Sequence, residues 1–345
     1  MTKNKKRGLR IFVSALIIIL SLLFLQRLLT PKYVDDVVEG AFIKEFYDEE
    51  HKEDLNLIFI GDCEVYSNFS PVTLWQEYGI NSYIRGSADQ YVWQSYYILE
   101  DTLKYVKPEA VVFNVLSLRN EQPKREEYNR MSLEGLRWSG TKVKAIFASM
   151  MEDEHFLDYV FPILRYHSRW NDIKDTDLEF FHNSMPVSYN GFYMKTAVRP
   201  PQDVPEGKPL NNYNFSEKAW SYLDRIRSLC EENGIELILV KAPSLYPYWY
   251  DEYEQQVEDY AEKHELMYIN FLEHKDEIGL DYETDTFDGG LHLNVSGAEK
   301  LSRWFGNILS EKGLSDLRGR ADLQSIWDEE IARYELEKTG RVIDK

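Results

Sequence analysis

The fold of this chain follows from Leu55-Asn-Leu-Ile-Phe-Ile60, a short and mostly apolar run that leads directly into Gly61-Asp62-Cys63. A continuous apolar run of this length is typical of a strand buried on both faces, as in a parallel sheet. In open α/β sheets, reactive groups lie just beyond the carboxyl ends of such strands. The sequence therefore places Cys63 where a nucleophile would stand, with a small buried cysteine as the alternative interpretation.

Further apolar runs alternate with helical patterns along the chain. The predicted strands cover 55–60, 81–84, 110–116, 235–240 and 267–270, and the predicted helices cover 70–79, 91–106, 215–233, 251–264 and 295–312. Strands and helices that alternate at this spacing favour parallel strands joined by right-handed crossovers. We therefore predict an α/β domain with five parallel strands in the order 2-1-3-4-5.

The alternation stops between residues 120 and 214, where helical patches and a turn-rich segment replace it. We expect this region to be an insertion packed over the sheet. The predicted division is a basic stub and transmembrane signal anchor over 1–30, a juxtamembrane connector over 31–53, an α/β domain over 54–313 that contains the insertion, and a charged C-terminal tail over 314–345.

The N-terminal segment predicts a membrane anchor. Residues 1–30 carry six basic and no acidic side chains, and Ile11 to Leu25 is apolar apart from two serines. At about 1.5 Å per residue, roughly 19 residues nearly cross a hydrocarbon core of about 30 Å. A cleaved signal peptide would need small residues after the run, and 24–29 offers none. We expect a single-pass protein of the cell membrane, N-terminus cytoplasmic and C-terminal domain extracellular; a buried core helix is the remaining alternative.

Charge and cysteine content limit the partners. The net charge is −19, and because the first thirty residues contribute six positive charges, the remainder carries about −25. Nucleic acid requires a basic surface, so we expect no nucleic-acid partner. Cys63 and Cys230 are the two cysteines; Cys230 falls in the helix predicted over 215–233 and is expected in the core, with a bridge to Cys63 as the alternative. His and Cys residues lack ligand spacing, so we expect no metal and no cofactor.

A second candidate segment is Asp285-Thr-Phe-Asp288-Gly-Gly-Leu-His292, immediately before the last predicted helix. An acid shortly before a histidine can accept a hydrogen bond from Nδ1–H, which leaves the other ring nitrogen free to take a proton from a nucleophile. Asp288 is the first choice for this acid and Asp285 the alternative. By spacing alone, an ordinary surface turn is the favoured interpretation of the segment.

Taken together, these residues resemble the blocks of SGNH (GDSL-type) hydrolases. Gly61-Asp62-Cys63 resembles the first block, in which Gly-Asp-Ser follows the first strand and serine is the nucleophile. Gly86 falls where the family has its second-block glycine, and the Asp288 to His292 segment resembles the closing Asp-x-x-His block. The resemblance covers roughly 54–119 and 215–311 and implies the three-layer, flavodoxin-like SGNH form of the predicted domain.

The chain departs from the family pattern in three ways. Cysteine replaces the serine nucleophile at position 63, and the spacing from Asp288 to His292 is four residues instead of three. The third block, Gly-x-Asn-Asp, is missing after the third strand, where Asn114 and Asn120 are the nearest stand-ins.

More closely, the layout resembles membrane-anchored SGNH-like proteins that accompany membrane-bound O-acyltransferases in teichoic-acid D-alanylation and exopolysaccharide O-acetylation. This implies an acyltransferase or esterase that acts on a cell-envelope polysaccharide or related polymer, with a membrane-bound O-acyltransferase as partner. The alternative is a catalytically inactive scaffold or glycan-binding partner of that multispanning enzyme.

The implied roles are nucleophile for Cys63, general base for His292 and orienting acid for Asp288. The backbone N–H groups of Cys63 and Gly86 would form an oxyanion hole, to which Asn114 or Gln90 would add a side-chain donor. Weaker candidates for contact with a glycan or phosphate are Arg165, Arg169 and Lys241. Their alternatives are ion pairs within the chain or, for Lys241, an ordinary surface position.

Overall fold

The computed structural model describes residues 3–31, 40–182 and 187–340. Its centre is a five-stranded sheet in the order β2-β1-β3-β4-β5, and every pair of neighbours is parallel. The strands are β1 (Leu57–Gly61), β2 (Ser82–Gly86), β3 (Ala110–Asn114), β4 (Glu236–Lys241) and β5 (Met267–Asn270). The predicted fold class and strand order are confirmed.

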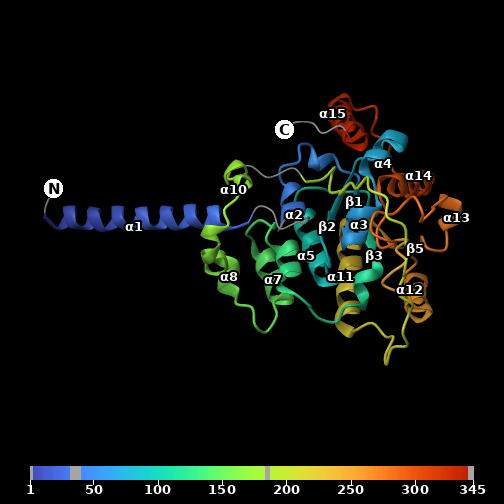
Figure 1. Cartoon of the computed structure of the whole chain (residues 1–345), viewed down its shortest axis with the longest axis horizontal. Helices are drawn as coiled ribbons and strands as arrows, with labels where there is room; N and C mark the ends of the chain where they lie inside the picture. The colour runs from blue at the N-terminus through green and yellow to red at the C-terminus, as the bar shows by residue number, and fades with distance from the viewer. Residues whose placement is uncertain (1–2, 32–39, 183–186, 341–345) are drawn as a thin grey trace.

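Helices cover both faces of the sheet, as Figure 1 shows. Alternate side chains of β1 enter two separate cores, because successive residues of a strand point to opposite faces: Ile58 and Ile60 enter one, and Leu57 and Phe59 the other. The first core is completed by α5 (Val92–Thr102), α11 (Glu217–Asn233) and α12 (Asp251–Lys263), and the second by α4 (Pro71–Tyr78) and α14 (Val295–Glu311). Cys230 lies unbridged in the first core.

Local sequence signals set the ends of these helices. Ser70 caps α4 by accepting a hydrogen bond of 3.2 Å from the Thr73 backbone N–H, and Gly79 ends the helix in the left-handed conformation. Asn294 likewise caps α14 by accepting from the Gly297 backbone N–H at 3.2 Å. Each cap satisfies a backbone donor that the first turn of a helix leaves without a partner.

The region between 120 and 214 packs on the sheet only in part: Asn190 accepts a hydrogen bond of 2.9 Å at its carbonyl oxygen from the backbone N–H of Ile84 in β2. Its first helices, α6 (Glu126–Leu133) and α7 (Gly140–Ser149), pack on α2 (Ala41–Glu45) and α5. The next elements flank the end of the N-terminal helix α1 (Lys3–Leu29), as Figure 1 shows. They are α8 (Phe156–Val160), α9 (Ile163–Tyr166), η3 (His167–Asn171) and α10 (Asp175–Glu179).

Helix α1 projects from the domain with its apolar residues exposed. Asn4–Leu29 has a mean hydropathy of 2.5 over its most apolar window and, within the described residues, is the one helix long and apolar enough to cross a membrane. This finding is compatible with a membrane anchor or a signal sequence. The orientation across the membrane stays a prediction.

The C-terminal segment is part of the domain, although the sequence suggested only a charged tail. Residues Ala321–Lys338 form α15, which packs on α4. Trp327 stacks on Trp75 with ring centroids 5.4 Å apart and donates a hydrogen bond of 3.1 Å from Nε1 to Asn81 Oδ1. The smaller elements are α3 (Cys63–Asn68), α13 (Lys275–Ile278), η1 (Lys52–Asp54) and η2 (Val115–Arg119).

Candidate active site

Cys63 is the first residue of α3, directly after β1. Asp62 caps this helix by accepting a hydrogen bond of 3.1 Å from the Glu64 backbone N–H. Gly86 ends β2 in register with Gly61. A Cβ atom at Gly86 would lie 2.6 Å from a methyl carbon of Val65, so a larger residue does not fit there. The glycine therefore lets the end of β2 approach the turn that carries Cys63.

His292 and Asp288 form a tight pair. His292 Nδ1 and Asp288 Oδ2 are 2.6 Å apart, and the second carboxylate oxygen accepts a hydrogen bond of 2.8 Å from the His292 backbone N–H. Asp285, the alternative acid, is used elsewhere: it accepts hydrogen bonds from Ser296 Oγ at 2.9 Å and from Lys300 Nζ at 2.7 Å. The geometry therefore favours Asp288 over Asp285 as the acid that could orient His292.

One hydrogen bond ties the histidine loop to the cysteine helix. Asn68, at the end of α3, accepts a hydrogen bond of 2.8 Å at Oδ1 from the Leu293 backbone N–H. An antiparallel bridge between Thr286 and Leu293 also closes the loop that carries His292. Sequence reasoning missed Asn68, since nothing in its local sequence separates it from an ordinary asparagine at a helix end.

Cys63 and His292 perturb one another's proton affinity. Burial raises the pKa of the Cys63 thiol, and His292 opposes this by lowering it. Burial lowers the pKa of His292, but Cys63 and Asp288 outweigh it and raise that pKa to about 10. The His292 Nε2 atom is buried without a well-aligned hydrogen bond to any described residue. Each group therefore shifts the pKa of the other, and the thiol and the imidazole titrate as an interacting pair.

A buried ionic network lies beneath the cysteine turn. Lys241 Nζ lies 2.9 Å from Glu64 Oε1, and both side chains are fully buried. Burial and the neighbouring Glu64 raise the pKa of Asp62 to about 7. Lys241 thus has no exposed surface from which to contact a substrate, which contradicts the weak binding role suggested for it. Lys241 instead pairs with Glu64 of α3, a partner that the sequence did not reveal.

The two amides suggested for the oxyanion hole already have partners. Asn114 Nδ2 donates to Glu64 Oε2 at 2.8 Å and to Asp62 Oδ1 at 3.2 Å. Gln90 Nε2 donates to Ser95 Oγ at 3.0 Å and to the Arg85 carbonyl oxygen at 3.2 Å. Their role as oxyanion donors therefore stays a prediction, and the backbone N–H groups of Cys63 and Gly86 are the simpler donors.

Arg165 and Arg169 lie in the part of the insertion that flanks α1. Arg165 pairs with Glu126, and Arg169 pairs with Asp177 at 2.5 Å. Figure 1 places α8 and α10 beside α1, while α3 stands at the centre of the domain. The two arginines form ion pairs within the chain, so the structure does not bring them together with Cys63.

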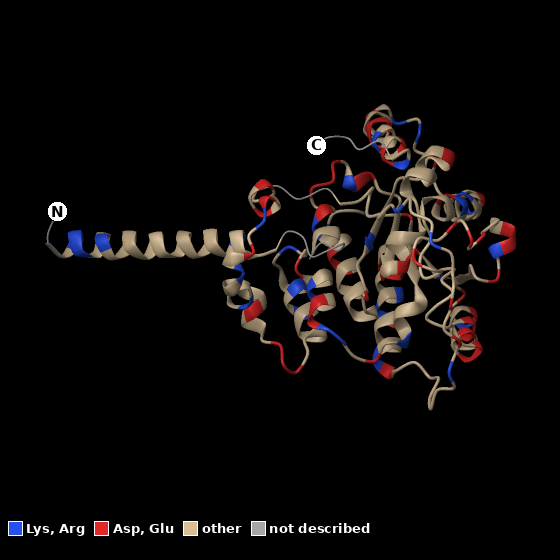
Figure 2. Cartoon of the chain, viewed as in Figure 1, with Lys and Arg blue, Asp and Glu red and all other residues tan. Residues whose placement is uncertain are grey.

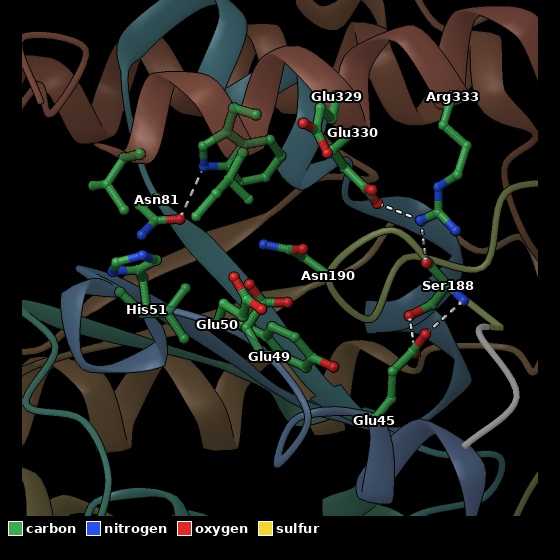
Figure 3. Close-up of a pocket in the computed structure, with 15 residues that line it drawn as sticks. Glu45, Glu49, Glu50, His51, Asn81, Ser188, Asn190, Glu329, Glu330 and Arg333 are labelled. Atoms are coloured by element: carbon green, nitrogen blue, oxygen red, sulfur yellow. Dashed lines mark hydrogen bonds and ion pairs between the residues drawn. The ribbon is translucent and has the colours of Figure 1, made fainter. Parts of the chain in front are cut away.

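A separate hollow of about 410 Å³ lies between α2, the start of β2 and α15. Figure 3 shows Glu45 beside Ser188 and Glu330 paired with Arg333. Burial raises the pKa of Glu45 to about 7, and burial with nearby carboxylates does the same for Glu49.

One group of potential metal ligands occurs among the described residues. The ligand atoms of His51, Asp54 and Asp322 lie within 4.8 Å of one another. Arg320 pairs with Asp54 at 2.9 Å and with Asp322 at 2.6 Å, so both carboxylates already contact a cation of the chain. The predicted absence of a metal stays a prediction.

Comparisons with known proteins identify no relatives by sequence: no protein-family model matches the chain, and no curated protein matches it. Among solved structures, a proposed acylhydrolase of Bacteroides fragilis NCTC 9343 has 9% identity and a TM-score of 0.37, covering 79% of this chain and 95% of its own. A GDSL-like lipase of Bacteroides thetaiotaomicron VPI-5482 has 11% identity and a TM-score of 0.36, covering 79% and 100%. These likenesses are too low to argue from, so the fold assignment rests on the sheet and the functional argument on the site.

Proposed function

We propose that this chain is a membrane-anchored O-acyltransferase or esterase that acts on a cell-envelope polysaccharide or related polymer. The observation that carries the proposal is the 2.6 Å contact between His292 Nδ1 and Asp288 Oδ2, on a loop tied to the helix that begins at Cys63. A histidine oriented in this way supports proton transfer at Nε2 next to a nucleophile.

In the first half of the proposed reaction, the Cys63 thiolate attacks the carbonyl carbon of a donor ester. The alcohol oxygen leaves with the proton of His292 Nε2, and a thioester remains on Cys63. In the second half, His292 takes the proton of an acceptor hydroxyl, whose oxygen attacks the thioester and releases the thiolate. A sugar hydroxyl as acceptor gives transfer, and water gives hydrolysis.

The substrate class and the partner rest on the resemblance to SGNH-like proteins that accompany membrane-bound O-acyltransferases. The anchor would be α1, with its basic N-terminal end in the cytoplasm and the domain outside. Figure 2 shows basic residues at the N-terminal end of α1 and acidic residues spread over the domain. This distribution supports an exported, acidic domain that does not bind nucleic acid.

A second candidate function is that of a catalytically inactive partner. The observation that favours it is the state of the cysteine: burial raises the thiol pKa, and the amides of Asn114 and Gln90 are occupied. A thiol that stays protonated is a weak nucleophile. In this reading the domain would bind the polymer or the multispanning enzyme.

Intact-mass spectrometry after incubation with p-nitrophenyl acetate separates the two candidates. We expect one acetyl adduct on the full-length chain and none on Cys63→Ala. The matched control is Cys230→Ala, which should be acetylated like the unmodified chain because Cys230 is buried in the core. We also expect His292→Ala to slow adduct formation by about 10²-fold or more.

Absence of an adduct, together with full function of His292→Ala in cells, would establish the non-catalytic role. A sugar acceptor then distinguishes the two enzymatic activities. If acetyl groups reach the sugar, the chain is a transferase; if they reach only water, it is an esterase.

A further inference from the structure

The insertion exposes an unusual amount of apolar surface. Outside α1, twelve large apolar side chains are exposed among the described residues, and eight of them lie between residues 138 and 178. Six of these fall within 157–178, a segment that we name the collar. They are Leu157, Phe161, Leu164, Trp170, Ile173 and Leu178, exposed between 37% and 64%. Clusters of this kind mark surfaces that contact a partner or a membrane.

The collar has both exposed and buried apolar side chains. Leu157 of α8, Phe161 at the end of that helix and Leu164 of α9 are each exposed by 50% or more. Tyr159 is buried instead: it is 1% exposed, and the guanidinium carbon of Arg130 lies 3.8 Å from its ring centroid. The collar therefore packs into the domain through Tyr159 and presents other apolar side chains at its surface.

The collar is fastened to the last turn of α1. Arg169 Nη1 donates a hydrogen bond of 3.0 Å to the Leu29 carbonyl oxygen, and Arg27 Nε donates one of 2.6 Å to the Phe181 carbonyl oxygen just beyond the collar. The rings of Phe24 and Phe181 lie 5.2 Å apart. The exposed apolar surface of α1 thus runs directly into that of the collar.

We propose that the collar lies in the interface of the lipid bilayer, around the point where α1 leaves the hydrocarbon core. The inference rests on the membrane anchoring proposed for α1. Figure 1 shows α8 and α10 on either side of the end of α1, so a bilayer crossed by α1 meets both. Tryptophan and phenylalanine are enriched in such interfacial elements, which bury one apolar side among headgroups and acyl chains.

Charge indicates what kind of lipid surface the collar fits. It contains Arg165, Arg169 and Lys174 as bases, against the acids Asp158, Asp172, Asp175 and Asp177. Two of the bases are consumed by ion pairs, Arg165 with Glu126 and Arg169 with Asp177. Attraction to anionic headgroups therefore contributes little, and the apolar side chains drive the contact. Immersion should not depend on anionic lipid or on salt.

Spin labels on the full-length chain in phosphatidylcholine nanodiscs test this placement. The background carries Cys63→Ser and Cys230→Ala, and labels are attached at Leu164→Cys, Leu178→Cys, Ile18→Cys or Val198→Cys. Val198 is the matched control, because it is 56% exposed and lies outside the collar. We expect labels at 164 and 178 to collide with oxygen at least threefold more than with a water-soluble nickel chelate, and the label at 198 to show the reverse.

The label in α1 separates failure of the collar from failure of the anchor. If the label at 18 is immersed while those at 164 and 178 behave like the one at 198, the anchor stands and the collar proposal is overturned. If the label at 18 is also exposed to the nickel chelate, the proposed anchoring itself is wrong. Labels at 164 and 178 shielded from both reagents would place a second copy of the chain over the collar, which also overturns the proposal. An unchanged pattern in nanodiscs with anionic lipid is the expected result for an apolar contact.

Discussion

At the scale of single residues, opposing influences act on the pKa of the Cys63 thiol. Burial favours the neutral thiol of Cys63, whereas the charge of His292 favours the thiolate. Asp288 shifts this balance because its carboxylate stabilises the imidazolium that forms when the cysteine loses its proton. The proposed proton transfer therefore depends on the contact between the Asp288 carboxylate and His292 Nδ1.

Asp288→Asn should lower the rate of Cys63 acylation by about 10³-fold or more, because an amide can hold the wrong tautomer of His292. The matched control is Asp285→Asn. It removes charge from the contacts with Ser296 and Lys300, so it should lower the free energy of unfolding while the acylation rate per folded molecule is preserved. Equal loss of acylation in both variants would contradict the assignment of Asp288. Adduct formation and urea denaturation are the two measurements.

At the scale of elements, α15 is the part of the fold whose contribution to stability is most open to test. Trp327 is 3% exposed and stacks on Trp75 of α4. Trp327→Ala should therefore lower the free energy of unfolding by about 3–5 kcal/mol, the range for a buried aromatic side chain cut to alanine. Trp170→Ala, at a residue 64% exposed, should change it by less than about 0.5 kcal/mol. Urea denaturation in detergent micelles measures both, and similar losses would show that α15 is only loosely packed.

The elements of the sheet were predictable because burial on both faces leaves a continuous apolar run. The strand expected at 267–270 matches β5 residue for residue, and the strand expected at 235–240 is displaced by one residue from β4. The buried face of α15 was also present in the sequence, as Leu323, Trp327 and Tyr334 at spacings of four and seven. Surrounding charges obscured it.

Other features could not be predicted, because periodicity shows which side of a helix is apolar but not what that side meets. The insertion over 120–214 was expected to pack over the sheet, yet its helices α9, η3 and α10 contact α1. In the site, the turn after β1 and the acid–histidine segment were visible as motifs. The contact of Asn68 with Leu293 and the pair of Glu64 with Lys241 join residues far apart in sequence, so only the folded chain reveals them.

At the scale of the whole molecule, buried titratable groups make stability depend on pH. The pKa values of Glu45 and Glu49 are raised to about 7, so the folded chain holds protons that the unfolded chain releases near pH 4.5. Stability from these groups is present at low pH and is lost as the pH rises from about 4.5 to about 7. The His292 pKa, raised from 6.5 to about 10, adds stability that is present below about pH 6.5 and lost as the pH rises through 10.

We therefore expect the free energy of unfolding to fall in two successive pH ranges. Glu49→Gln should reduce the fall of the free energy of unfolding across the lower range by roughly 2–3 kcal/mol. His292→Gln should reduce the fall across the upper range. Urea denaturation across pH 4.5 to 10 measures the profile. Glu311→Gln is the control, because its carboxylate is exposed and should leave both slopes unchanged. A profile that rises with pH between 4.5 and 7 would contradict the raised pKa values.

The hydrogen bonds from Arg27 to Phe181 and from Arg169 to Leu29 hold the end of α1 to the domain, and this attachment limits how the domain can move. A domain on a loose tether samples a wide volume and can search for distant targets. Here the end of α1 is hydrogen-bonded to the domain, so in a membrane the turn that carries Cys63 would stay at one distance from the bilayer and at one tilt. Under the proposed function, a polymer would have to enter that layer to be modified, and its distance from the bilayer would decide which of its units are reached.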